Sequence, residues 1–237
     1  MNKRTIFKRI TALVLTAALL ASVALAAEPT KKREKAEDPD WALLLVNPTN
    51  ALPEDFSVEL VELENGMEVD KRIYDDLNAM LIACWADGLE PQVCSAYRTA
   101  ATQTRLYNNK VSRLRAQGYS RSNAKTEAAR WVALPDTSEH QTGMALDLVS
   151  ADYPNLDMKQ ANTPEQKWLM EHCWDYGFIL RYPADKTKVT GIGYEPWHYR
   201  YVGKEAAAAI HKTGDCFEEY LQTRSAQASE LQLAASR

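Results

Sequence analysis

The spacing of apolar residues constrains the fold of this chain most strongly, because it alternates between the period of a helix and the period of a strand. Apolar residues recur at helical spacing over residues 71–87, and Gly88 follows where a left-handed residue would end that helix. Over residues 143–149 they occupy every second position, which predicts a half-buried strand with Asp147 on the face opposite the apolar side chains. Helices interspersed with short strands and tight turns indicate a single α+β domain.

Capping and helix-ending residues place the other elements. Thr163 begins a capping box with proline at the first helical position, so a helix is expected to start there. The C-terminal tail, residues 224–237, is polar and rich in alanine and serine, so it is expected to be loosely ordered. The same reasoning predicts helices over residues 99–117, 120–133, 164–176 and 204–213, and strands over residues 43–46, 91–97, 178–182 and 197–202.

The N-terminus has the composition of a signal peptide. Residues 1–26 carry four positive charges and then an apolar run, and they end on Ala24-Leu25-Ala26, a pattern that signal peptidases accept. This predicts a secreted or extracytoplasmic protein; an uncleaved segment would instead anchor the chain in a membrane. Residues 27–40 are rich in Lys, Glu, Asp and Pro and are expected to form a flexible linker. The folded domain is then predicted over residues 41–223.

Charge and length limit what the mature domain binds. Removal of four positive charges changes the net charge from -4 to -8, and this acidic balance argues against nucleic acid as a partner. About 210 mature residues suit one globular domain that can bury a core and a cleft. We expect this domain to act as a monomer.

Four cysteines enter an oxidising compartment if the chain is exported. An even number of cysteines in that setting predicts disulfides. We expect one disulfide between Cys84 and Cys94 and another between Cys173 and Cys216. The alternative is that all four are free and buried as small apolar residues.

Two of the four histidines lie near carboxylates in the sequence. His140 precedes Asp147 by seven residues, and His198 follows Glu195 by three. A zinc ion in a hydrolase needs three protein ligands and an open position, and two imidazoles with one carboxylate leave a net positive centre that lowers the pKa of water toward about 7. His140, Asp147 and His198 therefore form a candidate zinc site, and Gly143 would allow the tight turn that aims the first two at one ion. Each residue alone is more often an ordinary core or surface group, so only their joint occurrence carries the prediction.

Two further residues suit catalysis. Pro196 holds Glu195 in an extended conformation, so the Glu195 carboxylate can reach the reacting water without being a metal ligand. Glu195 is therefore the candidate general base. Arg98 could hold a carbonyl oxygen or a terminal carboxylate of the substrate with its guanidinium, although a surface ion pair would explain Arg98 alone equally well.

Three segments resemble the VanY-type D-alanyl-D-alanine carboxypeptidases, a family that shares its fold with the hedgehog signalling domain. They are SAYRT at residues 95–99, SEHQTGMALD at 138–147 and EPWHYRY at 195–201, in the order of the family. The similarity extends over about 180 residues, from near Trp41 to near Leu221. It implies a hedgehog/DD-peptidase-like α+β fold in which helices flank a small antiparallel sheet.

The resemblance also implies an activity and a set of residues. It implies a zinc-dependent D,D-carboxypeptidase that hydrolyses the C-terminal D-alanine of peptidoglycan stem peptides. One departure from the family pattern is Asp136, where similar proteins usually have glycine, which leaves open whether the loop entering the metal site takes the same turn. The implied residues are the Zn²⁺ ligands His140, Asp147 and His198, the base Glu195, the transition-state-stabilising Arg98, and Ser138 and Gln103 near the substrate.

Other functions fit parts of the sequence. An L,D-carboxypeptidase acting on tetrapeptide stems would use the same metal site, and a non-catalytic module could keep a structural zinc ion and bind wall peptides. Glu195 favours catalysis, because a purely structural zinc site has no use for an unliganded carboxylate. Residues 122–125 and 212–214 match the Ser-x-x-Lys and Lys-Thr-Gly motifs of serine penicillin-binding enzymes, but no Ser-x-Asn lies between them.

Overall fold

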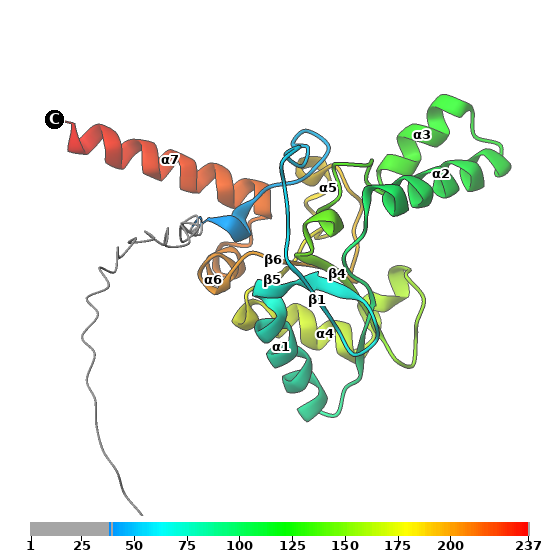
Figure 1. Ribbon diagram of the computed structural model, residues 1–237, viewed down its shortest axis with the longest axis horizontal. Helices are drawn as coiled ribbons and strands as arrows, with labels where there is room; N and C mark the ends of the chain where they lie inside the picture. The colour runs from blue at the N-terminus through cyan, green and yellow to red at the C-terminus, as the bar shows by residue number, and fades with distance from the viewer. Residues whose placement is uncertain (1–37, 39, 237) are drawn as a thin grey trace, which may run out of the picture. The chain divides into compact units, whose positions relative to one another are not determined.

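The computed structural model describes residues 38 and 40–236, so the predicted signal segment 1–26 and most of the predicted linker 27–40 lie outside the described residues. Four strands form an antiparallel sheet in the order β3-β4-β6-β5. Strands β4, β5 and β6 are labelled at the centre of the domain in Figure 1. A separate two-stranded sheet joins β1 to β2. The bounds are β1 Leu60–Glu62, β2 Glu68–Asp70, β3 Pro91–Ser95, β4 Ala145–Ser150, β5 Phe178–Leu180 and β6 His198–Tyr201.

Two helices pack against one face of the four-stranded sheet. α1 Tyr74–Ala86 follows the 3-10 turn η2 Lys71–Ile73, and α4 Pro164–His172 runs into the 3-10 turn η5 Cys173–Tyr176. The predicted α+β fold with helices around a small antiparallel sheet is therefore confirmed. The main hydrophobic core lies between these helices and the sheet and includes Leu77, Met80, Leu146, Leu148, Leu169 and Tyr199.

The central strand β4 is buried on both faces, which corrects the half-buried strand expected at this position. All six residues of β4 are buried. Leu146 and Leu148 face the main core. Asp147 points to the opposite side, as predicted from the alternation, but the 3-10 turn η3 Glu139–Thr142 covers that side. Polar side chains therefore close the second face of the strand and shield it from solvent.

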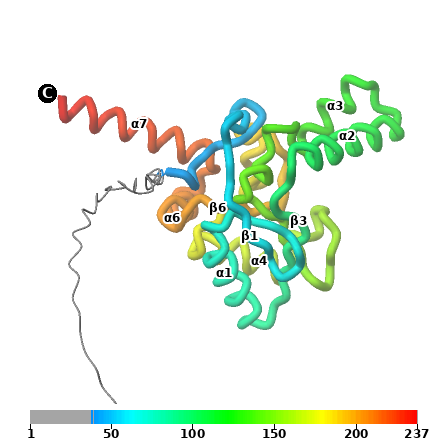
Figure 2. The backbone as a smooth tube through the Cα atoms, viewed as in Figure 1, coloured from blue at the N-terminus to red at the C-terminus, as the bar shows by residue number. Residues whose placement is uncertain are grey.

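Helices α2 and α3 form a hairpin that projects from the body of the domain (Figure 2). α2 Ala100–Ala116 and α3 Arg121–Ala129 pack together through a small cluster of Leu114, Ala124 and Ala128. The side chain of Thr99 caps α2, and the helix predicted over residues 99–117 is confirmed. α3 ends four residues before the predicted position.

The C-terminal helices differ in how well the sequence predicted them. α6 Lys204–Thr213 has the predicted bounds. The tail, expected to be loosely ordered from residue 224, instead continues the helix α7 Phe217–Ala235. Alanine, glutamine, glutamate and leucine favour a helix even where they pack against nothing, and they dominate this segment. The remaining short elements are η1 Trp41–Leu43, η4 Met158–Asn162 and α5 Thr187–Thr190. None of the helices in the described residues is long and apolar enough to cross a membrane.

The strand predicted over residues 43–46 is absent, and that prediction was wrong. The segment begins as the 3-10 turn η1, and it pairs with no strand. Its backbone instead serves a buried guanidinium: Arg200 Nη2 donates hydrogen bonds to the carbonyl oxygens of Ala42 at 3.0 Å and Leu44 at 2.9 Å. Because these carbonyls are already bonded, the apolar run packs on the core without joining a sheet.

The two predicted disulfides are also absent, because all four cysteines are free in the structure. Cys84 lies in the core on α1, whereas Cys94 occupies an irregular position of β3 and points its Sγ toward the carbonyl oxygen of Asp147 at 3.4 Å. Cys173 belongs to the main core, whereas Cys216 precedes Phe217 of a second cluster around α6 and α7. Within each predicted pair the two thiols therefore lie in different environments, and three of the four cysteines are buried as small apolar residues.

Candidate metal centre

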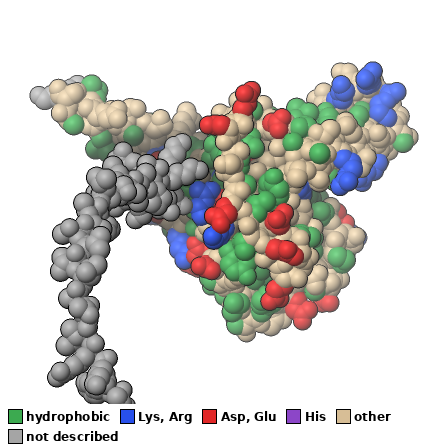
Figure 3. Space-filling view, viewed as in Figure 1, with side chains coloured by type: hydrophobic (Ala, Val, Ile, Leu, Met, Phe, Trp, Pro, Cys, Tyr) green, Lys and Arg blue, Asp and Glu red, His purple; other side chains and the backbone are tan. Residues whose placement is uncertain are grey.

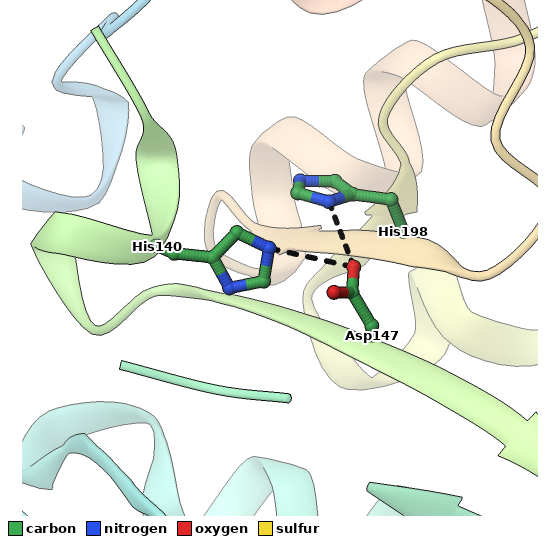
Figure 4. A group of neighbouring side chains, drawn as sticks. All are labelled: His140, Asp147 and His198. Atoms are coloured by element: carbon green, nitrogen blue, oxygen red, sulfur yellow. Dashed lines mark hydrogen bonds and ion pairs between the residues drawn. The ribbon is translucent and has the colours of Figure 1, made fainter. Parts of the chain in front are cut away.

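Three elements bring the predicted ligands together. His140 lies in η3, Asp147 in β4 and His198 in β6. The sheet register sets Asp147 directly opposite His198, so both side chains leave neighbouring strands on the same face. Gly143 ends η3 with a left-handed φ of +73° and turns the chain from His140 into β4, as the sequence predicted. The three side chains converge from these separate elements (Figure 4).

The donor atoms of the three residues are close enough to share one ion. One ligand atom from each residue lies within 4.8 Å of the others, and all three residues are buried. His140 Nε2 lies 3.4 Å from Asp147 Oδ1, and His198 Nδ1 lies 3.1 Å from the same oxygen. The second nitrogen of His140, Nδ1, lies 2.7 Å from the Ala96 carbonyl oxygen, so it carries a proton and leaves Nε2 free to bind a metal. Two imidazole nitrogens and one carboxylate oxygen are a donor set that fits zinc.

Arg98 is tied to this centre through the carboxylate of Asp147. Its Nη2 lies 2.5 Å from Asp147 Oδ2, and its Nε donates a hydrogen bond to Ser95 Oγ at 2.8 Å. The Arg98 backbone N–H donates to the carbonyl oxygen of His140 at 3.1 Å. Burial alone would raise the pKa of Asp147, but its interactions with His140 and Arg98 hold that pKa well below its usual range. Asp147 is therefore ionised and available as a ligand.

The two histidines have opposite electrostatic surroundings. Burial lowers the pKa of His140 to about 4, so its imidazole is neutral at neutral pH. Burial also opposes the charge on His198, but the nearby carboxylates of Asp147 and Glu139 raise its pKa to about 9. A metal ion competes with a proton for the same nitrogen, so metal binding at His198 releases a proton.

Glu195 stands beside the ligands and outside the ligand set. It precedes β6, and its Oε2 lies 3.8 Å from His198 Nδ1, which is too long for a hydrogen bond. Its backbone N–H donates to the Tyr182 carbonyl oxygen at 3.2 Å, which fixes the loop. Burial raises the pKa of its carboxyl to about 8. Glu195 is thus a carboxyl group with a strong affinity for a proton, next to a candidate metal site.

A cleft of about 300 Å³ opens over the three ligands and also contains the other predicted site residues. Ser138 and Gln103 both line it and are almost fully buried. Gln103 Nε2 donates to the Ala133 carbonyl oxygen at 2.7 Å, whereas its Oε1 has no hydrogen-bond partner among the described residues. On α2, Lys110 and Arg113 belong to the cleft wall, and lysine and arginine side chains gather on the α2–α3 hairpin (Figure 3).

Sequence reasoning missed a buried charge cluster behind the metal centre. Glu139 accepts a hydrogen bond from Arg181 and forms an ion pair with Arg200. Arg181 also pairs with Glu218, so two carboxylates balance two guanidinium groups. Arg181, Arg200 and Glu139 are fully buried or nearly so. The only signal in the sequence was Arg200 between two aromatic residues of a strand, a position where a charge requires a buried partner or solvent.

The fold and the site define a metallopeptidase: a buried ligand set of two histidines and one aspartate, with a free carboxyl group beside it at the base of a cleft. The family model of D-alanyl-D-alanine carboxypeptidases named VanY matches residues 66–204. The chain belongs to this family and is a hydrolytic peptidase.

Individual relatives agree with the family. A D-alanyl-D-alanine carboxypeptidase of Enterococcus faecalis is 45% identical over 191 residues, which cover 81% of this chain and 69% of the relative. A putative carboxypeptidase of Bacillus subtilis, YodJ, is 34% identical over 201 residues, which cover 80% of this chain and 70% of the relative.

Solved structures share the fold. VanYB in complex with D-alanine-D-alanine is 46% identical with a TM-score of 0.73, and the match covers 77% of this chain and 98% of that structure. A VanY D,D-pentapeptidase in complex with Zn(II) is 45% identical with a TM-score of 0.71, covering 76% and 99%. The LD-carboxypeptidase LdcB is 34% identical with a TM-score of 0.61, covering 75% and 84%.

Proposed function

We propose that this chain is a zinc-dependent D,D-carboxypeptidase that removes the C-terminal D-alanine from peptidoglycan stem peptides. The observation that carries this proposal is the buried set of His140, Asp147 and His198 with Glu195 next to it but outside it. A structural zinc site uses all four positions for protein ligands, whereas a catalytic one keeps a position open. The Zn(II) and D-alanine-D-alanine in the related VanY structures suit this assignment.

In this mechanism the three ligands hold a zinc ion, which when bound acts as a Lewis acid on water and on the peptide carbonyl. Glu195 accepts the proton of the attacking water and then delivers it to the leaving amine, since its carboxyl stands beside the ligands and outside the ligand set. Arg98 lies at the cleft with its guanidinium held by Ser95 and Asp147. There it stabilises the negative charge that develops on the carbonyl oxygen.

Ser138 and Gln103 are proposed to bind the substrate beside the reacting bond. Both line the cleft, and the Gln103 carbonyl oxygen has no partner among the described residues, so it can accept a hydrogen bond from a substrate N–H. Lys110 and Arg113 make the α2 wall basic, which favours peptides that carry carboxylates upstream of the scissile bond.

The choice of a D,D bond over an L,D bond rests on similarity. A D-alanyl-D-alanine carboxypeptidase of Enterococcus faecalis and a VanY D,D-pentapeptidase are each 45% identical to this chain, whereas LdcB, an LD-carboxypeptidase, is 34% identical. We propose action outside the cytoplasm, where the wall substrate lies, with the predicted signal segment 1–26 directing export and the domain working as a monomer.

The test is mass spectrometry of defined stem peptides after incubation with the full chain. Loss of one D-alanine from a pentapeptide stem, but not from a tetrapeptide stem, is the expected result, and a zinc chelator should abolish it. Loss from the tetrapeptide would assign L,D activity, and cleavage of free D-alanyl-D-alanine would assign a dipeptidase. Binding without cleavage, or cleavage that a chelator leaves unchanged, would refute the proposal.

A further inference from the structure

Two buried polar atoms face each other behind the metal centre, and neither has a hydrogen-bond partner among the described residues. They are Glu139 Oε2 and His198 Nε2, which lie 3.7 Å apart. Both side chains are almost completely shielded from solvent. A buried unpaired acceptor opposite a buried unpaired nitrogen is costly, because neither atom can turn to water instead.

The carboxylate of Glu139 is held in place by its other oxygen. Arg181 Nε donates to Glu139 Oε1 at 2.7 Å, and Arg200 Nη1 lies 3.1 Å from the same atom. Arg181 in turn donates from its Nη atoms to Glu218, at 2.9 and 2.7 Å. Since both guanidinium groups engage Oε1, the second oxygen of Glu139 is left to face His198.

The two metal-binding histidines present different nitrogens to the centre. His140 turns Nε2 toward Asp147 and places Nδ1 against the Ala96 carbonyl oxygen. His198 turns Nδ1 toward Asp147, so its outer nitrogen is Nε2 (Figure 4). Ala96 thus supplies an outer acceptor for His140, and the Glu139 carboxylate is placed to do the same for His198.

We propose that Glu139 is a positioning residue for the metal centre, which accepts a hydrogen bond from His198 Nε2–H and thereby leaves Nδ1 as the nitrogen aimed at the ion. A ligating imidazole whose outer N–H donates to a carboxylate is fixed in tautomer and orientation and is a stronger ligand. A shift of less than about 1 Å brings the present 3.7 Å separation into hydrogen-bond range. The proposal rests on the proposed function only in taking His198 as a zinc ligand.

Glu139→Gln tests this role sharply. The two arginine donors retain the amide oxygen of the new side chain, so its NH₂ group faces His198 Nε2. That NH₂ donates to Nε2 and moves the imidazole proton to Nδ1, the ligand atom. We expect the zinc dissociation constant of the full chain, measured by competition with a chromophoric chelator, to rise about 10- to 100-fold.

Glu218→Gln is the matched control, because Glu218 also bonds Arg181 but is not among the acids near His198. It removes one partly buried negative charge from the same cluster, and its zinc dissociation constant should stay within about 3-fold of the wild type. Similar thermal unfolding midpoints of the two metal-free variants would establish that folding is disturbed equally. Equal zinc affinity of Glu139→Gln, Glu218→Gln and wild type would overturn the proposal while leaving the proposed function intact.

A measurement on the wild type keeps the proposal testable if Glu139→Gln does not fold. Nitrogen-15 NMR of the zinc-loaded full chain should identify His198 Nε2 as the protonated nitrogen and Nδ1 as the metal-bound one. Assignment of the proton to Nδ1 would overturn the role of Glu139. Failure of the wild type to bind zinc at all would overturn this proposal and the proposed function together.

Discussion

The backbone of Gly143 lies directly against the backbone of Asp70. The Asp70 N–H donates a 2.9 Å hydrogen bond to the Gly143 carbonyl oxygen, and a β-carbon at Gly143 would stand only 2.8 Å from Asp70 N. Gly143 also has a left-handed φ of +73°. The turn that joins two metal ligands therefore tolerates only glycine, for a conformational reason and a steric one.

We predict that Gly143→Ala lowers the free energy of unfolding by roughly 2–4 kcal/mol, from the left-handed backbone and the contact with Asp70 together. Gly88→Ala is the control, since Gly88 has a φ of +77° but no atom within 4 Å of its β-carbon position. The free energy of unfolding of the Gly88→Ala variant should fall by only about 1–2 kcal/mol. Urea unfolding of the two variants measures the difference. Equal decreases in the free energy of unfolding would mean that the backbone at Asp70 shifts without cost to make room for the new β-carbon.

Asp136 takes a left-handed backbone conformation although it is not a glycine. Its φ of +64° is the only positive value at a non-glycine residue in the described chain. Its N–H donates to Gln141 Oε1 at 2.8 Å, and its carbonyl oxygen accepts from Leu52 N–H at 2.7 Å. The loop into the metal site therefore makes a left-handed turn at a non-glycine residue, which these backbone hydrogen bonds hold in place.

We predict that Asp136→Gly changes the free energy of unfolding by less than about 1 kcal/mol, because relief of the left-handed strain offsets the greater freedom of glycine in the unfolded chain. Asp136→Val should lower the free energy of unfolding by about 1–3 kcal/mol, because a β-branched residue is strained in the left-handed conformation. Chemical denaturation of both variants provides the measurement. A valine variant as stable as the glycine one would show that the loop rearranges.

The local sequence was sufficient to predict the bounds of helices that begin or end on their own capping residues. Thr99, Thr163 and Gly214 mark boundaries of α2, α4 and α6, and these helices lie close to their predicted bounds. The strand prediction for residues 43–46 failed because Arg200, far along the chain, donates hydrogen bonds to the carbonyl oxygens of Ala42 and Leu44. No local sequence pattern reveals that contact.

The same distinction holds at the site. His140, Asp147 and His198 converge as the spacing and the resemblance suggested, since the residue types themselves carry the chemistry. Glu139 and Arg181 were missed because their pairing joins residues 42 positions apart, and a glutamate or an arginine seen alone suggests a solvated surface.

Glu195→Gln should separate catalysis from metal binding. The substitution preserves shape but removes the proton acceptor, so kcat should fall about 10²- to 10⁴-fold. Zinc affinity should change little, because Glu195 Oε2 lies 3.8 Å from His198 Nδ1 and is not in the ligand set. Asp147→Asn is the contrasting variant and should lose zinc and activity together. Parallel loss of zinc in Glu195→Gln would reassign Glu195 as a ligand.

Arg98→Ala should reduce kcat/KM at least about 10²-fold, because a charge that stabilises the developing oxyanion is lost. Arg98 also bonds Asp147 Oδ2, so zinc affinity must be measured in the same variant. Arg98→Lys keeps the charge but not the fork that engages Ser95 and Asp147, and an intermediate rate is expected. Activity of Arg98→Ala near that of the wild type, with zinc saturated, would exclude the role in the transition state.

The outer part of α7 should be dispensable, because every described side chain from residue 225 onward is exposed and the helix projects away from the sheet (Figure 1). Deleting residues 225–237 keeps Phe217 in the second core cluster and the 2.8 Å ion pair of Arg224 with Asp40. The free energy of unfolding should change by less than about 0.5 kcal/mol, and peptide cleavage should be unaffected. Phe217→Ala, at the buried start of the same helix, should instead lose about 3–5 kcal/mol. A large decrease in the free energy of unfolding of the truncated chain would indicate that the outer helix packs against another surface in the folded protein.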